Sequence, residues 1–206
     1  MPEGDFHYYV KDELYSLLSA SPLCHSCKSE RPIGIVRPDI SLFIHKKPVA
    51  IEIQHSALGE DQIDARMAEY AEQNIHVLWI VLEGYGDPDI RDGIDKDRYP
   101  ASALERYLHT LYFGRVYYYH GGLEVTPVHF DQHYTRVPAR EWYDSSGTAY
   151  SGGGYDKRSK RLRVLNVGER VNIVKDFKAT LRTAWTGGRV SVPACRLWID
   201  RGGKWW

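Results

Sequence analysis

Two carboxylates lie in or beside short apolar runs, where an acidic side chain is costly unless another group compensates its charge. Asp39 directly precedes one such run, residues 40–44, and Glu52 lies inside another, residues 49–53. If the chain brings the two carboxylates together, they repel each other unless a cation joins them. Mg²⁺ takes oxygen ligands, keeps several waters and needs only one or two carboxylates. The pair therefore predicts a small metal site for Mg²⁺ (or Mn²⁺).

The two apolar runs form a predicted β-hairpin that positions these acids. Both runs are rich in β-branched residues, and a polar turn separates them. Side chains alternate across a strand, so Glu52 and Gln54 share one face. Ile51 and Ile53 share the other. An edge strand with one face in water would also explain this alternation, without any metal. The possible meeting of Glu52 with Asp39 across the hairpin is what favours the metal site.

Helices and a buried strand surround the hairpin in the predicted arrangement. Apolar residues at helical spacing predict helices over residues 5–19 and 58–73, and a third over about 101–112. Residues 75–82 are almost continuously apolar, as in a central strand buried on both faces. Strand, helix and strand in succession imply a crossover connection and partly parallel pairing. The sequence therefore predicts an α/β fold with a mixed central sheet flanked by helices.

The remaining segments carry shorter predicted elements. Residues 31–36 form a predicted first strand, and residues 83–100 are a loop rich in turn-forming and acidic residues. A second hairpin joins residues 115–120 to 123–128 across a Gly-Gly turn. The three tyrosines in it, residues 117–119, are interpreted as ordinary strand residues. The last predicted elements are strands over residues 162–167 and 171–174 and a short basic helix over residues 177–185.

The composition is that of a globular protein. The 206 residues are 43% hydrophobic and 26% charged, which allows one domain, or one domain with an extension, and a sizeable core. No apolar run approaches the roughly 18–20 residues of a membrane span, so we expect no membrane partner. The acidic N-terminus lacks the apolar core of a secretory signal. Three cysteines are too few for a disulfide framework, and we expect a cytoplasmic protein.

Cys24 and Cys27 form a Cys-x-x-Cys pair. A structural zinc site needs four ligands and usually a second pair, whereas Cys195 is the only other cysteine. A plain reduced pair is the favoured interpretation, with structural zinc as the alternative.

Charge is unevenly distributed along the chain. From residue 157 to residue 206 there are 13 Lys/Arg and 3 Asp/Glu, although the net charge of the whole chain is zero. A basic tail on an acidic body indicates contact with nucleic acid, and a tail folded back on that body would explain the charge equally well. Four of the six tryptophans lie in the last 22 residues, beside Arg and Lys. They either stack on the bases of single-stranded nucleic acid or anchor the tail.

The composition changes again where Ser, Gly and Tyr dominate, in residues 144–160. Such a segment is typical of a flexible linker or loop. We therefore predict an α/β domain over residues 1–140, a linker or loop over residues 141–160, and a basic, Trp-rich C-terminal extension over residues 161–206.

The acidic residues also carry a resemblance to a known family. An Asp at the start of one strand, followed by Glu-x-Lys or Glu-x-Gln on the next, resembles the PD-(D/E)XK nuclease superfamily. The string Ala-Ile-Glu-Ile-Gln-His-Ser (residues 50–56), followed by Arg66, Tyr70 and the strand 77–81, resembles the competence protein CoiA-like family. The resemblance covers about residues 7–130. It implies a restriction-endonuclease-like fold, magnesium dependence and a role on DNA, in processing or recombining incoming strands.

The resemblance implies a role for each residue of the motif. Asp39, Glu52 and the carbonyl of Ile53 would hold the metal. Gln54 stands where the superfamily usually has Lys, and its amide could hold the attacking water by hydrogen bonds but carries no charge.

Positive charge at the site would then come from Arg66 or Lys11. His7, four residues before Lys11, would lie on the same side of the first helix and face the site. The predicted catalytic residues are Asp39, Glu52, Gln54, Arg66, Lys11 and His7.

DNA is the predicted partner, whether single-stranded, duplex or branched, with recombination proteins as further candidates. The sequence does not predict the oligomeric state. The predicted DNA contacts are two residues of the family motif and five basic residues that follow the linker: Tyr70, Ser56, Lys157, Arg158, Lys160, Arg161 and Arg163.

Two alternatives to a nuclease remain open. One is an accessory factor with the same fold that binds DNA or protein and has lost hydrolysis. The other is a metal-free protein in which Asp39 and Glu52 pair with neighbouring cations.

Overall fold

The computed structural model describes residues 3–56, 58–187 and 190–206. The helices found there are α1 (Glu3–Ala20), α2 (Glu60–Glu72) and α3 (Ala103–Leu111), with two short 3₁₀ turns, η1 (Gly84–Gly86) and η2 (Arg91–Gly93). The strands are β1 (Cys24–Ser29), β2 (Ile40–Ile44), β3 (Lys47–Gln54), β4 (His76–Val81), β5 (Tyr99–Pro100), β6 (Val116–Gly121), β7 (Glu124–Val137), β8 (Arg140–Tyr143), β9 (Ala149–Gly152), β10 (Tyr155–Val167), β11 (Val171–Asn172), β12 (Phe177–Arg182), β13 (Trp185–Gly187), β14 (Val190–Val192) and β15 (Cys195–Asp200).

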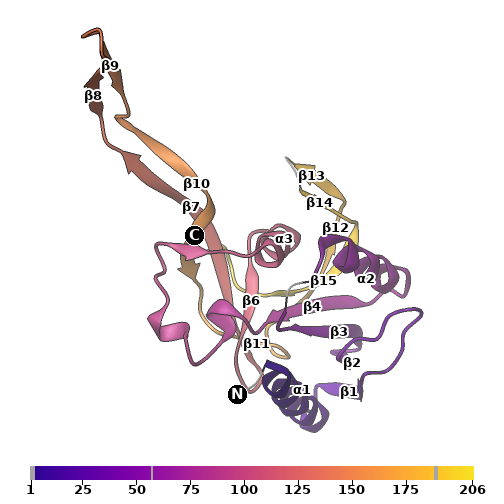
Figure 1. Ribbon diagram of the computed structural model, residues 1–206. Helices are drawn as coiled ribbons and strands as arrows, with labels where there is room; N and C mark the ends of the chain where they lie inside the picture. The colour runs from indigo at the N-terminus through magenta and orange to yellow at the C-terminus, as the bar shows by residue number, and fades with distance from the viewer. Residues whose placement is uncertain (1–2, 57, 188–189) are drawn as a thin grey trace.

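One mixed sheet organises these elements. Its main path runs β1-β2-β3-β4-β6-β7-β10-β5, and 11 strands of the described chain belong to it (Figure 1). The ribbons β8–β9 and β13–β14 pair separately. The predicted α/β class with a mixed central sheet is confirmed, and it is that of a restriction-endonuclease-like domain. None of the helices in the described ranges has the length and apolar character needed to cross a lipid bilayer.

The predicted hairpin and crossover are both present. Strands β2 and β3 pair antiparallel with Ile40 opposite Ile51, and the turn between them holds His45 and Lys46 at φ 48° and 65°. Two positive φ values in a two-residue turn match the twist of the strands that it joins. Helix α2 then leads to β4, which runs parallel to β3 and is buried at every position.

The helices cover opposite faces of the sheet. On β6, Tyr118 donates a hydrogen bond to Glu105 of α3 at 2.6 Å, whereas the next residue, Tyr119, donates to Glu13 of α1. Because neighbouring side chains of a strand point to opposite faces, α1 and α3 lie on different sides. Figure 1 shows α2 on the same side as α3. The interpretation of the tyrosines at residues 117–119 as ordinary strand residues is confirmed, since all three lie in β6 and are buried.

The C-terminal residues complete the central sheet. Strand β15 runs parallel to β4 with Leu197 beside Val77, and β12 pairs antiparallel with β15 over six residues. Trp198 is fully buried and donates its indole N–H to the carbonyl of Ile173 at 2.8 Å. The predicted helix over residues 177–185 is therefore wrong: the backbone of this segment is paired with β15 instead. Residues 161–206, expected as an extension, supply strands to the same sheet as residues 1–140.

A long arm replaces the expected linker. Strands β7 and β10 stay paired beyond the ends of the other strands of the sheet and form an arm. Strands β8 and β9 continue this arm to its tip (Figure 1). Residues 141–160 thus form mostly paired strands. The strand expected at residues 31–36 is reduced to one bridge between Ile33 and Val36, and the edge strand is β1 instead.

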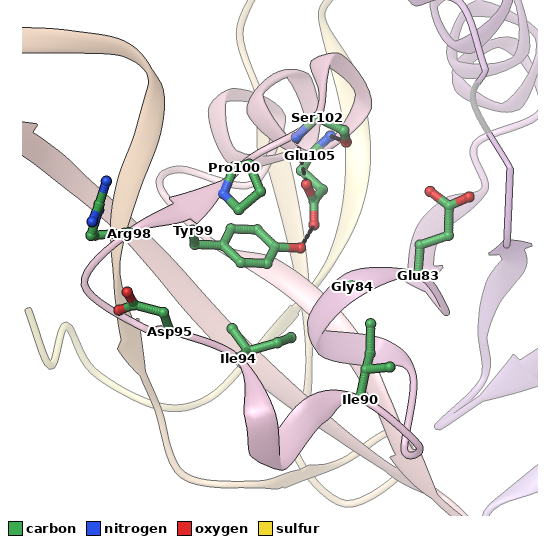
Figure 2. A pocket seen from close by; sticks show the side chains of 10 residues that line it. All are labelled: Glu83, Gly84, Ile90, Ile94, Asp95, Arg98, Tyr99, Pro100, Ser102 and Glu105. Atoms are coloured by element: carbon green, nitrogen blue, oxygen red, sulfur yellow. Dashed lines mark hydrogen bonds between the residues drawn. The ribbon is translucent and has the colours of Figure 1, made fainter.

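Helix α3 begins at a buried carboxylate. Ser102 and Glu105 form a capping box, in which Glu105 accepts the backbone N–H of Ser102 at 2.6 Å. The other oxygen of Glu105 accepts the hydroxyls of Tyr99 at 2.5 Å and Tyr118 at 2.6 Å. Figure 2 shows the Tyr99 bond on the wall of a hollow of about 370 Å³. Both carboxylate oxygens accept hydrogen bonds from neighbouring residues, so Glu105 has a structural role.

The position of Trp198 in the core generates a prediction about stability. Replacing Trp198 with Ala should lower the free energy of unfolding by about 3–5 kcal/mol, because it leaves a large cavity in the sheet. Urea unfolding followed by circular dichroism measures this. The matched variant Trp185→Ala, at a position 47% exposed, should change the value by no more than about 0.5 kcal/mol. A main transition that Trp198→Ala leaves unchanged would mean that the C-terminal strands are not part of the central folding unit.

Candidate active site

Asp39 and Ile53 are joined by the pairing of β2 with β3. Asp39, just before β2, accepts the backbone N–H of Ile53 on its Oδ2 at 2.8 Å. Its Oδ1 lies 3.4 Å from Nε2 of His7, and the same nitrogen lies 3.1 Å from the carbonyl oxygen of Ile53. One carboxylate oxygen and one carbonyl oxygen therefore converge on a single point, which the imidazole of His7 reaches from α1.

The oxygens around His7 change its pKa. Its hydrogen bond to Asp39 raises the pKa of His7, against the effect of burial and of the positive charge on Lys11. The convergence point thus favours positive charge, as a cation site requires.

Glu52 is held from the α2 side of the sheet. Glu52 is 4% exposed, and its Oε1 accepts hydrogen bonds from Nη1 of Arg66 at 2.7 Å and from the hydroxyl of Tyr70 at 2.5 Å. Burial raises the pKa of Glu52 to about 7, the nearby charge of Asp39 adds to this rise, and the bonds from Tyr70 and Arg66 oppose it. A carboxyl group with a pKa near neutrality is typical of functional sites.

The two acids face one hollow of about 490 Å³. Asp39 and Glu52 both line it, as does Ile53. The prediction that the hairpin brings these two acids to one site matches this arrangement. Other predicted residues on the same wall are His7, Gln54, Ser56 and Arg66.

The oxygen donors of this hollow fit a small hard cation. Two carboxylates and one carbonyl suit Mg²⁺, which takes oxygen ligands and completes its shell with water. In residues 3–56, 58–187 and 190–206, no group of three or more His, Cys, Asp or Glu side chains is arranged to hold a metal. A metal in the hollow would therefore depend on a backbone carbonyl and on water or substrate oxygens.

Lys11 does not line the hollow but contacts a residue that pairs with its wall. It is 4% exposed, and its Nζ lies 2.5 Å from Oε1 of Glu30. Glu30 also contacts Arg37, which lines the hollow. The pairing with Lys11 lowers the pKa of Glu30. Lys11 thus reaches the site through Glu30 and Arg37.

Glu30 and Arg37 were not predicted from the sequence. Glu30 follows β1, and its backbone N–H bonds to the carbonyl of Asp39 at 3.0 Å. A correct prediction of the edge strand β1 would have brought Glu30 to the site. The first strand was predicted over residues 31–36, a few residues after its actual position.

Gln54 and Ser56 lie at the end of β3. The Gln54 side chain donates its Nε2 to the carbonyl of Ser56 at 2.6 Å, and both residues line the hollow. Gln54 is thus oriented by the chain that follows it, beside Glu52, where the superfamily motif has its third residue.

Tyr70 and the five basic residues do not lie on the wall of the hollow. Tyr70 is fully buried and donates to Glu52, so it holds the carboxylate and is not on a surface that could touch DNA. Its predicted DNA contact is corrected to a positioning contact. The basic residues lie on β10 in the arm: Lys157, Arg158, Lys160, Arg161 and Arg163.

The cysteine pair lies on the edge strand. Cys24 and Cys27 are half-buried free thiols, and burial raises the pKa of both. Within the described residues they join no metal-binding group of three.

The mixed sheet with its three helices is that of an α/β domain of the restriction-endonuclease type. The chain belongs to the competence protein CoiA family, whose nuclease-like domain model matches residues 3–109. The predicted resemblance is confirmed. No curated protein and no solved structure matches the chain.

The matched region contains the whole wall of the hollow. It ends inside α3 and leaves out β6, the arm and the C-terminal strands. The site therefore belongs to the nuclease-like domain itself, whereas the arm lies outside the match.

The burial of Glu52 generates a prediction about pH. The folded chain keeps the Glu52 proton up to about pH 7, whereas the ordinary pKa of the group is 4.5. The folded state therefore binds more protons than the unfolded state in this range, and stability falls as pH rises from about 4.5 through 7. Without metal, the loss should be on the order of 3 kcal/mol, from 1.36 kcal/mol per pKa unit.

Glu52→Gln isolates this effect, because its amide does not titrate. Urea unfolding at pH 5 and pH 8 should show a larger loss of stability in the wild type than in Glu52→Gln. Equal losses in both proteins would contradict the neutral, buried state of Glu52.

Proposed function

We propose that this protein is a magnesium-dependent nuclease that hydrolyses phosphodiester bonds of DNA. The supporting observation is the hollow in which the carboxylates of Asp39 and Glu52 lie beside the carbonyl of Ile53. Membership of a nuclease-like family makes phosphodiester hydrolysis the reaction of first choice.

Asp39, Glu52 and the Ile53 carbonyl would hold the metal. When bound, Mg²⁺ (or Mn²⁺) would polarise the phosphate and lower the pKa of a nearby water. The His7 imidazole contacts two of the same oxygens, so its N–H and a metal ion compete for them. Water attacks phosphorus, the bond to one ester oxygen breaks, and the products are a phosphate monoester and a hydroxyl.

The chain's own side chains orient the water and the phosphate. Gln54 holds the attacking water by hydrogen bonds from an amide that Ser56 orients. Arg66 and Arg37 line the same hollow and balance the negative charge that grows on the phosphate. Lys11 fixes Arg37 through Glu30.

Replacement of either acid tests the proposal. Asp39→Asn and Glu52→Gln keep the size of each side chain but remove its charge. We expect each to lower DNA cleavage with Mg²⁺ at least about 100-fold, because an ill-held metal costs several kcal/mol of charge stabilisation. Cleavage is measured on single-stranded, duplex and branched DNA.

Exposed Asp61 provides a matched control on α2, and Asp61→Asn should cleave like the wild type. Cleavage that survives both active-site substitutions would exclude this mechanism. DNA binding without cleavage by the wild type, with any divalent ion, would instead identify an accessory factor.

Tyr70→Phe gives a subtler test of the same site. Loss of the hydroxyl removes a hydrogen bond that lowers the pKa of Glu52. The acid limb of the pH–rate profile should therefore move to higher pH by about one to two units, because a hydrogen bond to a charged group contributes about 1.5–3 kcal/mol. The rate at high pH should change little. A uniform loss at every pH would mean that Tyr70 acts on the substrate or on folding instead.

A further inference from the structure

The β7–β10 arm extends away from the body of the protein. Every residue of β8 and β9 at its tip is exposed. Figure 1 shows the arm pointing away from the sheet and its helices. The basic segment from residue 157 to residue 206 therefore divides: β12 and β15 fold back onto the body, whereas the start of β10 lies in the arm.

A bulge displays basic side chains near the base of the arm. The register of β10 against β7 shifts between Arg158 and Arg163, so residues 159–162 lie opposite a single residue of β7. The Ser159 hydroxyl accepts the backbone N–H of Leu162 at 2.8 Å and of Arg161 at 3.3 Å. The bulge is thus a bonded loop, and the exposed side chains of Lys160 and Arg161 project from it.

Positive charge on the arm is poorly compensated. Burial lowers the pKa of Arg163, and the positive charges of Arg106 of α3 and of Arg158 lower it further. Asp156 is paired with Arg136 at 3.4 Å. In the described parts of the chain, no ion pair reaches Lys157, Arg158, Lys160 or Arg161.

A further acid of the arm, Asp144, is used in the tip turn, and Glu141 of β8 is exposed. Asp144 accepts the Ser146 hydroxyl at 2.6 Å and the Thr148 backbone N–H at 3.0 Å. The basic residues of the arm therefore offer several donors to an external anion.

The tip carries an open aromatic platform. Trp142 stacks on Tyr150 with ring centres 6.0 Å apart and planes within 14°. The indole lies over Gly152, where an added Cβ would be 3.2 Å away. Trp142 is 51% exposed and Tyr150 is 46% exposed, so the rings remain open to a ligand. The platform and the basic bulge lie on the same arm, and proteins bind single-stranded nucleic acid with aromatic rings that stack on bases and basic side chains that contact the phosphates.

We propose that the β7–β10 arm binds single-stranded DNA, with phosphates on the basic bulge and an unpaired base on the Trp142–Tyr150 platform. This inference rests on the proposed function for the choice of DNA as the ligand. Single strands are favoured over duplex because the bases of a duplex already stack on one another and leave no face for the tip. Charge complementarity favours a polyanion over a second copy of this neutral chain.

Fluorescence anisotropy in EDTA tests this with the full chain, a labelled single-stranded oligothymidylate and a duplex of equal length. Binding is read without cleavage, so a failed nuclease would leave this test intact. Wild type should bind the single strand more tightly than the duplex. Trp142→Ala should weaken single-strand binding at least about fivefold, the lower end of the effect of one stacked base.

Lys160→Ala combined with Arg161→Ala should weaken binding at least about fivefold. It should also reduce the slope of log affinity against log salt by about 1.4, because two phosphate contacts are lost at 0.7 each. The matched controls are exposed residues away from the arm, Trp185→Ala and the pair Lys175→Ala with Lys178→Ala, and these should bind like the wild type.

Three results would overturn the proposal. They are a wild type that binds no DNA, arm variants that bind as tightly as the wild type, and arm and control variants that lose affinity equally. Analytical sedimentation of the same variants tests whether the arm instead binds a second copy of the chain. Self-association that Trp142→Ala abolishes while DNA binding stays unchanged would assign the arm to a second copy of the chain. Circular dichroism melts that match the wild type show that each variant is folded.

Discussion

The hydrogen bond from the backbone N–H of Ile53 to the carboxylate of Asp39 is the contact on which the site depends. It ties the start of β2 to the end of β3 and leaves the second Asp39 oxygen directed at the Ile53 carbonyl and at His7. Strand β3 can present these groups because β2 pairs on one side and β4 on the other, which fixes its register over its whole length. A slip of one residue would send Glu52 to the opposite face, away from α2.

Burial of Glu52 is the cost of this arrangement. A carboxylate beside the buried strand β4 loses its water, and Arg66 and Tyr70 from α2 offset part of that loss. These two residues do not offset the whole effect of burial, so the pKa of Glu52 stays raised. A cation in the hollow would favour the charged form of both acids. This effect of a cation on the two acids is the physical argument for the proposed metal dependence.

Local sequence patterns predicted the part of the fold that surrounds the site. The hairpin, the crossover through α2 and the buried strand β4 each have a periodicity that can be read within about twenty residues. Pairings between distant segments could not be read in this way. Strand β15 reaches β4 across more than a hundred residues of chain, and nothing in the local sequence of either strand indicates that contact. The helix was wrongly predicted over residues 177–185 for the same reason, because the partner of residues 177–182 in β15 lies outside any local window.

The same limit explains the residues of the site that were missed. Glu30 and Arg37 take part because β1 pairs with β2, and β1 is an irregular polar edge strand with a shifted register. The Gly- and Ser-rich segment at residues 144–160 suggested a linker from composition alone. The segment forms part of a paired arm instead, and Gly153 and Gly154, which link β9 to β10, adopt positive φ values of 83° and 78° that permit a tight bend.

A crystal soaked in Mn²⁺, with anomalous diffraction, tests the central claim most directly. The account predicts one peak between Asp39 and Glu52, within coordination distance of an oxygen of each and of the Ile53 carbonyl, and loss of that peak in Asp39→Asn. A wild-type crystal without a peak there, in which Glu52 stays bonded to Arg66 and Tyr70, would contradict it.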